Sequence, residues 1–239
     1  MTKGKLYLIP TVISENQNEV IPEQVRAVIK GVDYYLVENL RTARRFISSL
    51  KLGLTIEDLK FEQLNKKTST QKVEQLMKQI LEGKNIGLMS ESGCPGIADP
   101  GSLAVNYAHT IGASVVPLVG PSSILLTLMA SGFNGQQFAF HGYLPIDKKH
   151  LDQKIKALEE ESRRKNQTQL FIETPYRNNQ LFEQLKKQCY PQTQLCVARD
   201  VSGKDEFIKT ASIKDWRQIK VDLHKIPTVF ALFAGDGGR

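Results

Sequence analysis

Residues 90–101 hold the densest group of residue types that could bind a ligand in this chain of 239 residues. Their twelve positions carry three glycines, two prolines, two acids and two serines, and an apolar run at residues 85–89 precedes them. That run predicts a β-strand, and loops at the carboxyl ends of strands in open α/β sheets usually form ligand crevices. Glycine also lets the backbone approach a ligand closely. The segment therefore predicts a ligand-binding loop, and a long turn stiffened by its prolines is the alternative.

The sequence lacks the common phosphate-binding and metal-binding patterns. It has no G-x-x-x-x-G-K-[ST], and no G-x-G-x-x-G opens a helix after the first predicted strand. Nucleotide hydrolysis and standard dinucleotide binding are therefore disfavoured. Cys94, Cys189 and Cys196 are scattered without a C-x-x-C pair, and the four histidines are dispersed. We expect neither a disulfide framework nor a metal, and we expect a reducing cytoplasm.

Two further loops follow apolar strands and carry polar residues. Residues 117–124 lead from a predicted strand into a helix, where Ser122 or Ser123 is placed to cap the helix N-terminus. A capping role alone is the alternative to ligand binding. Another loop brings Glu173 and Arg177 close together, but ion pairs at helix starts are common and nearly neutral in energy.

Strands and helices alternate through the first half of the chain, which predicts a largely parallel sheet with crossover helices. Apolar runs predict strands, and apolar residues at helical spacing predict helices. The predicted strands are residues 5–9, 32–37, 85–89 and 114–119, and the predicted helices are residues 22–30, 40–50, 71–82, 103–109 and 124–130.

The pattern changes in the second half. The short run at residues 138–143 and the charged helix at 147–165 are interpreted as a linker region that enters a second unit. Consecutive strands without a helix between them indicate an antiparallel component. We therefore expect two α/β domains, residues 1–119 with a largely parallel sheet and residues 120–239 with a mixed sheet. In the second, strands are predicted at residues 169–173, 194–199, 206–210 and 228–234, with helices at 178–188 and 212–219.

Five segments, in this order and spacing, resemble the successive motifs of the tetrapyrrole methylase family. The resemblance extends over nearly the whole chain. Within the family it is strongest to the branch that 2′-O-methylates a cytidine ribose of small-subunit ribosomal RNA. The segments are residues 6–11, 90–101, 115–123, 140–145 and 171–177.

This resemblance implies two α/β domains with the active site in the cleft between them, S-adenosyl-L-methionine as methyl donor, and commonly a homodimer. The first domain would carry the acceptor side and the donor loop, and the second would complete the donor site. Carried over residue by residue, the resemblance nominates as donor-binding positions Pro10, Glu91, Gly93, Cys94, Ile97, Ser122, Ser123 and Ile172.

The chain departs from the branch's pattern at three places. Glu91 and Cys94 stand where the branch usually has aspartate and threonine, which puts the donor geometry in question. Asn39-Leu40-Arg41 replaces an Asp-Thr-Arg, and residues 12–16 replace a Gly-Asn-Leu loop. The last two changes fall on the expected acceptor side.

Methyl transfer from a sulfonium is an in-line displacement, so a protein contributes chiefly by aligning the reactants. If the acceptor is a ribose hydroxyl, a base must remove its proton. Glu173 is the leading candidate, with Arg177 positioning phosphate or orienting that acid, and Asp99 is the alternative base. A carboxylate fixed by Arg177 that only shapes the site is the competing interpretation.

The net charge of +7 and a pI near 9.2 fit a polyanionic partner such as nucleic acid. A soluble surface that is simply basic, with no such partner, is the alternative. The apolar run at residues 6–10 is too short to span a membrane, and no export signal is expected. Ribosomal RNA or the small ribosomal subunit is the expected partner. The alternatives are C-methylation of a corrin or uroporphyrinogen tetrapyrrole and a non-catalytic RNA-binding relative. Basic residues that could contact RNA, or lie on solvated helix faces, are Arg41, Arg44, Arg45, Lys148, Lys149, Arg163, Arg164 and Lys165.

Overall fold

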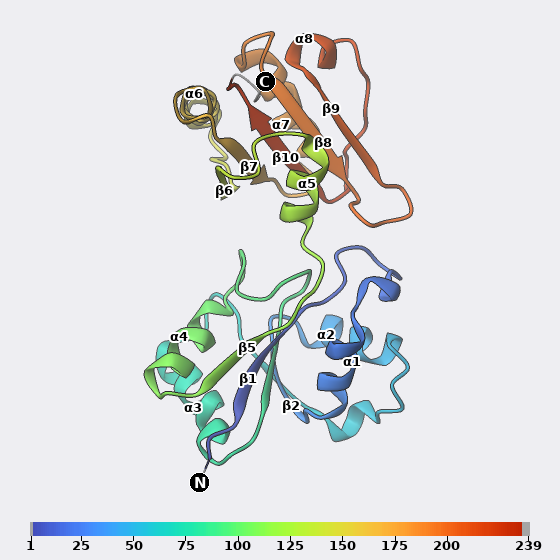
Figure 1. Cartoon of the computed structure of the whole chain (residues 1–239), viewed down its shortest axis with the longest axis vertical. Helices are drawn as coiled ribbons and strands as arrows, with labels where there is room; N and C mark the ends of the chain where they lie inside the picture. Colours follow the sequence, from blue (N-terminus) through green and yellow to red (C-terminus); the bar gives the residue numbers. More distant parts are fainter. Residues whose placement is uncertain (1, 236–239) are drawn as a thin grey trace. The chain divides into compact units, whose positions relative to one another are not determined.

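The structure, a computed structural model, describes residues 2–235 and divides into two compact units, Met1–Ser122 and Ser123–Arg239. Each unit contains one five-stranded β-sheet with helices on both faces (Figure 1). The expected combination of a parallel first sheet and a mixed second sheet in two α/β domains is confirmed. The sequence places the boundary between residues 119 and 120, and the units divide after Ser122.

The first unit contains a sheet with strand order β3-β2-β4-β1-β5, and each of its described strand pairs is parallel. Its strands are β1 (Lys5–Ile9), β2 (Tyr34–Val37), β3 (Lys60–Gln63), β4 (Ile86–Met89) and β5 (Ser114–Pro117). Its helices are α1 (Glu23–Lys30), α2 (Leu40–Ser49), α3 (Thr70–Leu81) and α4 (Ser102–Thr110), with 3-10 turns η1 (Asn18–Val20) and η2 (Ile56–Asp58).

Both faces of this sheet are buried, as is usual for parallel sheets covered by crossover helices. Alternate residues of β2 enter different cores, because successive side chains of a strand point to opposite faces. Leu36 packs with α3 and α4, whereas Tyr35 and Val37 pack with α1 and α2. Figure 1 shows these two helix pairs on opposite sides of the sheet. Because the strands of this sheet are parallel, their carboxyl ends all lie at one edge of the sheet.

The second unit contains a sheet with strand order β6-β7-β10-β8-β9, in which β6 and β7 are parallel and the other described pairs are antiparallel. Its strands are β6 (Phe138–Tyr143), β7 (Thr168–Ile172), β8 (Gln194–Arg199), β9 (Phe207–Ser212) and β10 (Thr228–Phe233). Its helices are α5 (Ser123–Ser131), α6 (Lys148–Lys165), α7 (Asn178–Gln188) and α8 (Ile213–Trp216).

Trp216 lies at the centre of the larger core of this unit. It is fully buried, its indole nitrogen donates to the Leu195 carbonyl oxygen at 2.8 Å, and its ring meets Phe182 edge-on. Phe171 of β7 belongs to the same core. The strand that leads to Glu173 is thus held by close packing from this side.

The interpretation of residues 138–165 as a linker region is wrong. Residues 138–143 form β6, which pairs with β7, and α6 buries Leu151, Ile155 and Leu158 in the core of the second unit. The segment is the first strand and crossover helix of a parallel pair, which requires a long connection. The segment resembles a linker in sequence because α6 is highly charged and only a narrow apolar stripe of the helix faces inward.

None of the helices in the described part of the chain combines the length and the hydropathy needed to cross a bilayer.

Candidate active site

Three loops that leave the carboxyl ends of β1, β4 and β5 touch one another. These strands are neighbours in the sheet, so their loops emerge side by side. The Thr11 N–H donates to the Gly93 carbonyl oxygen at 3.0 Å. A Cβ added to Gly120 would lie 2.2 Å from Cβ and Cγ of Pro10, so only glycine allows this approach. The structure thus brings together the predicted positions Pro10 and Gly93.

The loop of residues 90–101, called the donor loop below, is folded by its own side chains. Ser90 Oγ lies within hydrogen-bonding distance of two carbonyl oxygens, those of Ser92 (3.1 Å) and Gly93 (3.3 Å), and its hydroxyl can donate to either. Asp99 Oδ1 accepts from the N–H groups of Gly96 and Gly101, at 2.8 and 2.7 Å. Much of the composition singled out above therefore fixes the loop's own shape.

The loop presents two of the predicted donor positions outward. Glu91 is exposed, and the Ile97 side chain is 49% exposed although it is apolar. Ala98, the next residue, has φ 63°, a left-handed conformation that is uncommon for residues other than glycine. The tip of the loop is therefore a locally strained turn that exposes an apolar side chain.

Cys94 closes the donor loop onto the segment after β5. Its Sγ lies 3.4 Å from the Pro121 carbonyl oxygen, and burial raises the pKa of the Cys94 thiol, which favours the protonated form that can donate. Gly93 is confined from the other side, because an added Cβ would lie 3.1 Å from Ile13 Cγ2. The Cys94 thiol can thus donate a hydrogen bond at this position, as a hydroxyl could.

Two polar residues follow β2 at the same edge of the sheet. Asn39 Oδ1 accepts from the N–H groups of Arg41 (3.0 Å) and Thr42 (3.3 Å), which makes it the N-cap of α2. Glu38, the residue before it, donates its backbone N–H to the Met89 carbonyl oxygen at 3.4 Å. Sequence reasoning missed Glu38, although its place directly after a buried strand could have identified it.

The Glu38 carboxyl lies among other acids. Its burial, and next the charge of Glu91, raise the pKa of the Glu38 carboxyl, and Asp99 adds to the effect while Lys66 opposes it. Burial also raises the pKa of Asp99, against the hydrogen bonds that it accepts from Gly101 and Gly96. Asp99 Oδ2 is inaccessible and has no hydrogen-bond partner among the described residues. This geometry favours a shaping role for Asp99.

Of the remaining predicted residues, Ser122 is the last residue of the first unit, and the second unit holds the others. Ile172 ends β7, and Glu173 follows it with a side chain only 2% exposed. Glu173 Oε1 accepts from the Thr174 N–H at 2.7 Å, and Oε2 lies 3.1 Å from Arg177 Nη2. Ser123 is the first residue of α5. The expected Glu173–Arg177 pair therefore forms, and it is more buried than an ordinary surface ion pair.

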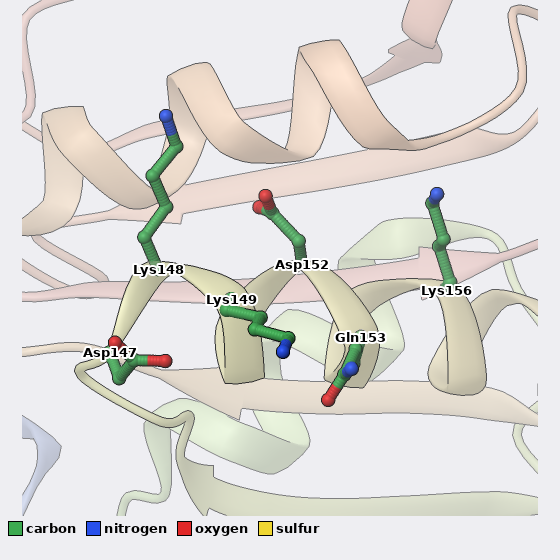
Figure 2. Close-up of a pocket in the computed structure, with 6 residues that line it drawn as sticks. All are labelled: Asp147, Lys148, Lys149, Asp152, Gln153 and Lys156. Carbon is green, nitrogen blue, oxygen red and sulfur yellow. The ribbon is translucent and has the colours of Figure 1, made fainter.

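The basic residues predicted to contact RNA are all exposed. Arg44 lies over the Phe61 ring at 5.4 Å, and Arg163 lies over the Tyr190 ring at 5.1 Å. Lys148 and Lys149 line an open groove of about 470 Å³ along α6, together with Lys156. Figure 2 shows Lys148, Asp152 and Lys156 projecting from the same side of this helix. Acidic residues are thus interspersed with the basic ones there.

A family model described as Tetrapyrrole (Corrin/Porphyrin) Methylases matches residues 18–216. The chain belongs to this family. This tetrapyrrole methylase is therefore a methyltransferase that depends on S-adenosylmethionine. Among the described residues, no group of three or more histidines, cysteines and acids is arranged to hold a metal ion.

Named relatives of this tetrapyrrole methylase include two ribosomal RNA enzymes. It is 31% identical over 209 residues to "Ribosomal RNA small subunit methyltransferase I" of Bacillus subtilis (strain 168), covering 86% of this chain and 67% of that protein. It is 28% identical over 218 residues to the protein of the same name from Buchnera aphidicola subsp. Acyrthosiphon pisum (strain APS), covering 89% and 73%.

Solved structures similar to this tetrapyrrole methylase share its fold. The methyltransferase CobJ matches with a TM-score of 0.63 at 16% identity, covering 98% of this chain and 94% of that one. Uroporphyrin-III-C-methyltransferase from Thermus thermophilus matches with a TM-score of 0.57 at 17% identity, covering 97% and 92%.

Proposed function

We propose that this protein transfers the methyl group of S-adenosylmethionine to the 2′-hydroxyl of a ribose in small-subunit ribosomal RNA. The relatives with the names above support the RNA substrate. The observation that carries the donor assignment is the interlocking of the loops after β1, β4 and β5, which leaves a backbone surface at the carboxyl edge of a parallel sheet.

The residues at this edge fit the donor's chemistry. S-adenosylmethionine supplies an electrophilic methyl group on a positively charged sulfur. The carboxylates of Glu91 and Glu38 give the edge a negative potential that favours a cation, and the glycine backbone admits close approach. Exposed Ile97 offers an apolar contact. We propose that the donor binds here, with Pro10, Gly93, Cys94, Ser122, Ser123 and Ile172 as its further positions.

Proton removal from the ribose is assigned to Glu173, with Asp99 as the alternative. Arg177 orients the Glu173 carboxylate, because its guanidinium lies within ion-pair distance of it. We also propose that the protein acts in the cytoplasm as a homodimer, as the family resemblance implies. Sedimentation equilibrium checks the dimer, since a monomer at micromolar concentration would exclude it.

Parallel incubations with labelled donor test the acceptor. The protein is given immature small ribosomal subunits, naked small-subunit RNA, or a uroporphyrinogen. Label in RNA is located by nuclease digestion, and label in the tetrapyrrole is measured after its extraction. Label in a 2′-O-methylated nucleotide is expected. Label only in the tetrapyrrole would refute the RNA assignment, and absence of both transfer and donor binding by calorimetry would favour a non-catalytic RNA-binding protein.

RNA binding is expected to weaken steeply with salt, because cationic side chains release counterions from phosphates. The variant Arg41→Gln/Arg44→Gln/Arg45→Gln on α2 should lower the slope of log K against log salt by roughly 2–3. Filter binding of small-subunit RNA between low and moderate salt measures this slope.

The matched control removes three exposed lysines from α3 and the turn that follows it, Lys72→Gln/Lys78→Gln/Lys84→Gln. Helix α3 packs on the face of the sheet opposite α2. This control loses the same charge, so a nonspecific effect of net charge would change both slopes equally. Equal slopes in the two triple variants would show that α2 is not part of the RNA-binding surface.

A further inference from the structure

We propose that the edge of the second sheet that holds Glu173 binds unpaired RNA, with Tyr176 stacking a base and Lys225 contacting a backbone phosphate. Unpaired bases stack on accessible aromatic rings, and a neighbouring cation supplies the charge that attracts phosphate. The inference rests on the proposed RNA substrate, and it adds the surface of the second unit that would hold this substrate.

Distant parts of the chain meet at this edge because of how the strands run. β6 and β7 are parallel, so Tyr143 at the end of β6 and the turn after β7 lie at the same edge. β10 is antiparallel to β7, so the residues that precede Thr228 lie there as well. The edge therefore brings together the turn that carries Tyr176 and the loop that carries Lys225.

The turn and the loop are fixed to each other through their backbones. The Lys225 N–H donates to the Pro175 carbonyl oxygen at 2.9 Å, and Asn178 Nδ2 donates to the Ile226 carbonyl oxygen at 2.7 Å. Lys225 has φ 60°, a left-handed conformation that persists only where the surrounding contacts hold it. Little backbone freedom would therefore be lost when a ligand binds to the two side chains.

The Tyr176 ring is held in place and still open to solvent. Tyr176 is 70% exposed. Lys225 Nζ lies 5.6 Å from the centre of its ring, and the His224 ring lies 6.0 Å away with its plane at 81° to that of Tyr176. Neither contact buries the ring, so a base can reach it. A fixed, accessible ring beside a cation is an arrangement that proteins use to bind single strands.

Lys225 is available to a phosphate. No carboxylate among residues 2–235 forms an ion pair with it. The acid of the same loop, Asp222, accepts from Asn179 Nδ2 at 2.7 Å and from the His224 N–H at 3.0 Å. The Lys225 ammonium can therefore meet an anion without first breaking an ion pair, which favours phosphate binding.

A second exposed ring lies at the same edge. Between Phe140 and Tyr143, β6 carries one residue more than the facing stretch of β7, and Gly142 there has φ 63°. Such bulges re-aim side chains and are frequent beside active sites. Tyr143 is exposed, and it pairs in register with Ile172, the residue before Glu173. RNA bound along this edge would therefore meet rings from two strand ends beside the proposed base.

Tyr190 provides a matched comparison in the same unit. β7 and β8 run in the same direction, since both are antiparallel to β10, so Tyr190, which precedes β8, lies at the opposite edge. It is 56% exposed, and the Arg163 guanidinium lies 5.1 Å from its ring. That guanidinium is already paired with Glu160 at 2.9 Å. Tyr190 thus resembles Tyr176 in its exposure and its nearby cation but differs in its place on the sheet.

The test measures binding of a single-stranded RNA of about ten nucleotides that contains 2-aminopurine, whose fluorescence is quenched by stacking. Tyr176→Ala and Tyr176→Leu should each raise the Kd about tenfold and reduce the quenching, whereas Tyr176→Phe, which keeps the ring, should stay within about threefold of wild type. Tyr143→Ala/Tyr176→Ala should bind more weakly than Tyr176→Ala. Tyr190→Ala should match wild type in both measurements.

Lys225→Gln tests the phosphate contact separately. It should lower the slope of log K against log salt by roughly 0.7, the value for one phosphate contact on a single strand. Lys187→Gln removes the same charge from an exposed position near the end of α7 and should leave the slope unchanged. Equal slopes in these two variants would refute the phosphate contact of Lys225.

Two results would overturn the stacking surface. One is equal affinity of wild type, Tyr176→Ala and Tyr190→Ala for the single strand. The other is a loss of affinity in Tyr176→Ala for intact small ribosomal subunits but not for RNA, because Tyr176 would then contact a ribosomal protein. Circular dichroism of each variant checks that its fold is kept.

The same measurements separate this inference from the proposed function. If wild type binds the RNA through Tyr176 but methylates none, the proposed function fails and the surface stands. If wild type methylates ribosomal RNA and Tyr176→Ala changes neither the Kd nor the KM for RNA, the surface fails and the proposed function stands.

Discussion

Gly120→Ala should reduce affinity for S-adenosylmethionine by about 100-fold or more, because the new methyl group cannot fit against Pro10. The added Cβ would lie 2.2 Å from two atoms of the proline ring, far inside van der Waals contact. Overpacking of this kind usually costs about 1–3 kcal/mol or more, and here the strain falls on the loops that form the donor site. Calorimetry with the donor measures the loss, and circular dichroism checks the fold.

A compensating variant distinguishes a local clash from general misfolding. Pro10→Gly removes both of the proline atoms that the new methyl group would meet, so Pro10→Gly/Gly120→Ala should recover part of the affinity that Gly120→Ala loses. Gly135→Ala is the control, since an added Cβ there meets nothing within 4 Å. Donor binding by Gly120→Ala at the wild-type level would contradict the packing of these loops against each other.

Arg177→Met should destabilise the second unit by about 3 kcal/mol, because it leaves the buried Glu173 carboxylate without its cation. The Glu173 side chain is 2% exposed, and that of Arg177 is 23% exposed. The double variant Glu173→Gln/Arg177→Met removes the charge as well and should recover most of the loss. Trp216, the one tryptophan of the chain, is fully buried in this unit, so its fluorescence during urea unfolding reports on the unit directly.

The control for this prediction breaks an exposed ion pair of the same unit. Lys165→Met removes the partner of Glu161, whose ion pair is partly exposed, with side chains 45% and 31% accessible, and should cost less than about 0.5 kcal/mol. An equally small effect of Arg177→Met would argue against the buried pair as a stabilising unit.

Methylation by the single variant Glu173→Gln tests the proposed base. Turnover near the wild-type level would exclude Glu173 as the group that removes the ribose proton.

The parts of the fold that follow from local pattern were predictable. Residues 86–89 are apolar and β4 forms there, and the stripe of Val73, Leu76 and Met77 gives α3. β3 was missed because it lies at the sheet edge, where Lys60 and Glu62 are exposed and the strand has no apolar alternation. Tertiary pairing with β2, rather than its own composition, makes this segment a strand.

The site was predictable only where one segment carried the signal. The donor loop could be recognised because glycine, proline and acids are concentrated in it. The contacts that hold it come from elsewhere: Cys94 meets Pro121, and Thr11 meets Gly93, across 27 and 82 positions of sequence (121 − 94 and 93 − 11). No local spacing encodes such pairs, because they depend on which strands become neighbours in the sheet. Asn39 departs from the Asp-Thr-Arg motif on the expected acceptor side. Its side chain caps the N-terminus of α2, which is a local structural reason for an asparagine at this position.

The central place of β1 in its sheet has a consequence for how the chain is made. β1 is translated before the other strands of its sheet, yet it lies between β4 and β5, and its second partner spans Ser114–Pro117. At typical rates of synthesis, residues 5–9 must wait on the order of 5–20 s before that partner has been made. Both edges of this apolar strand are unpaired until β4 has been made, and one edge stays unpaired until β5 follows, which invites association with other nascent chains. Completion of the first sheet is therefore tied to synthesis of β5, and truncation before it would leave one edge of β1 unpaired.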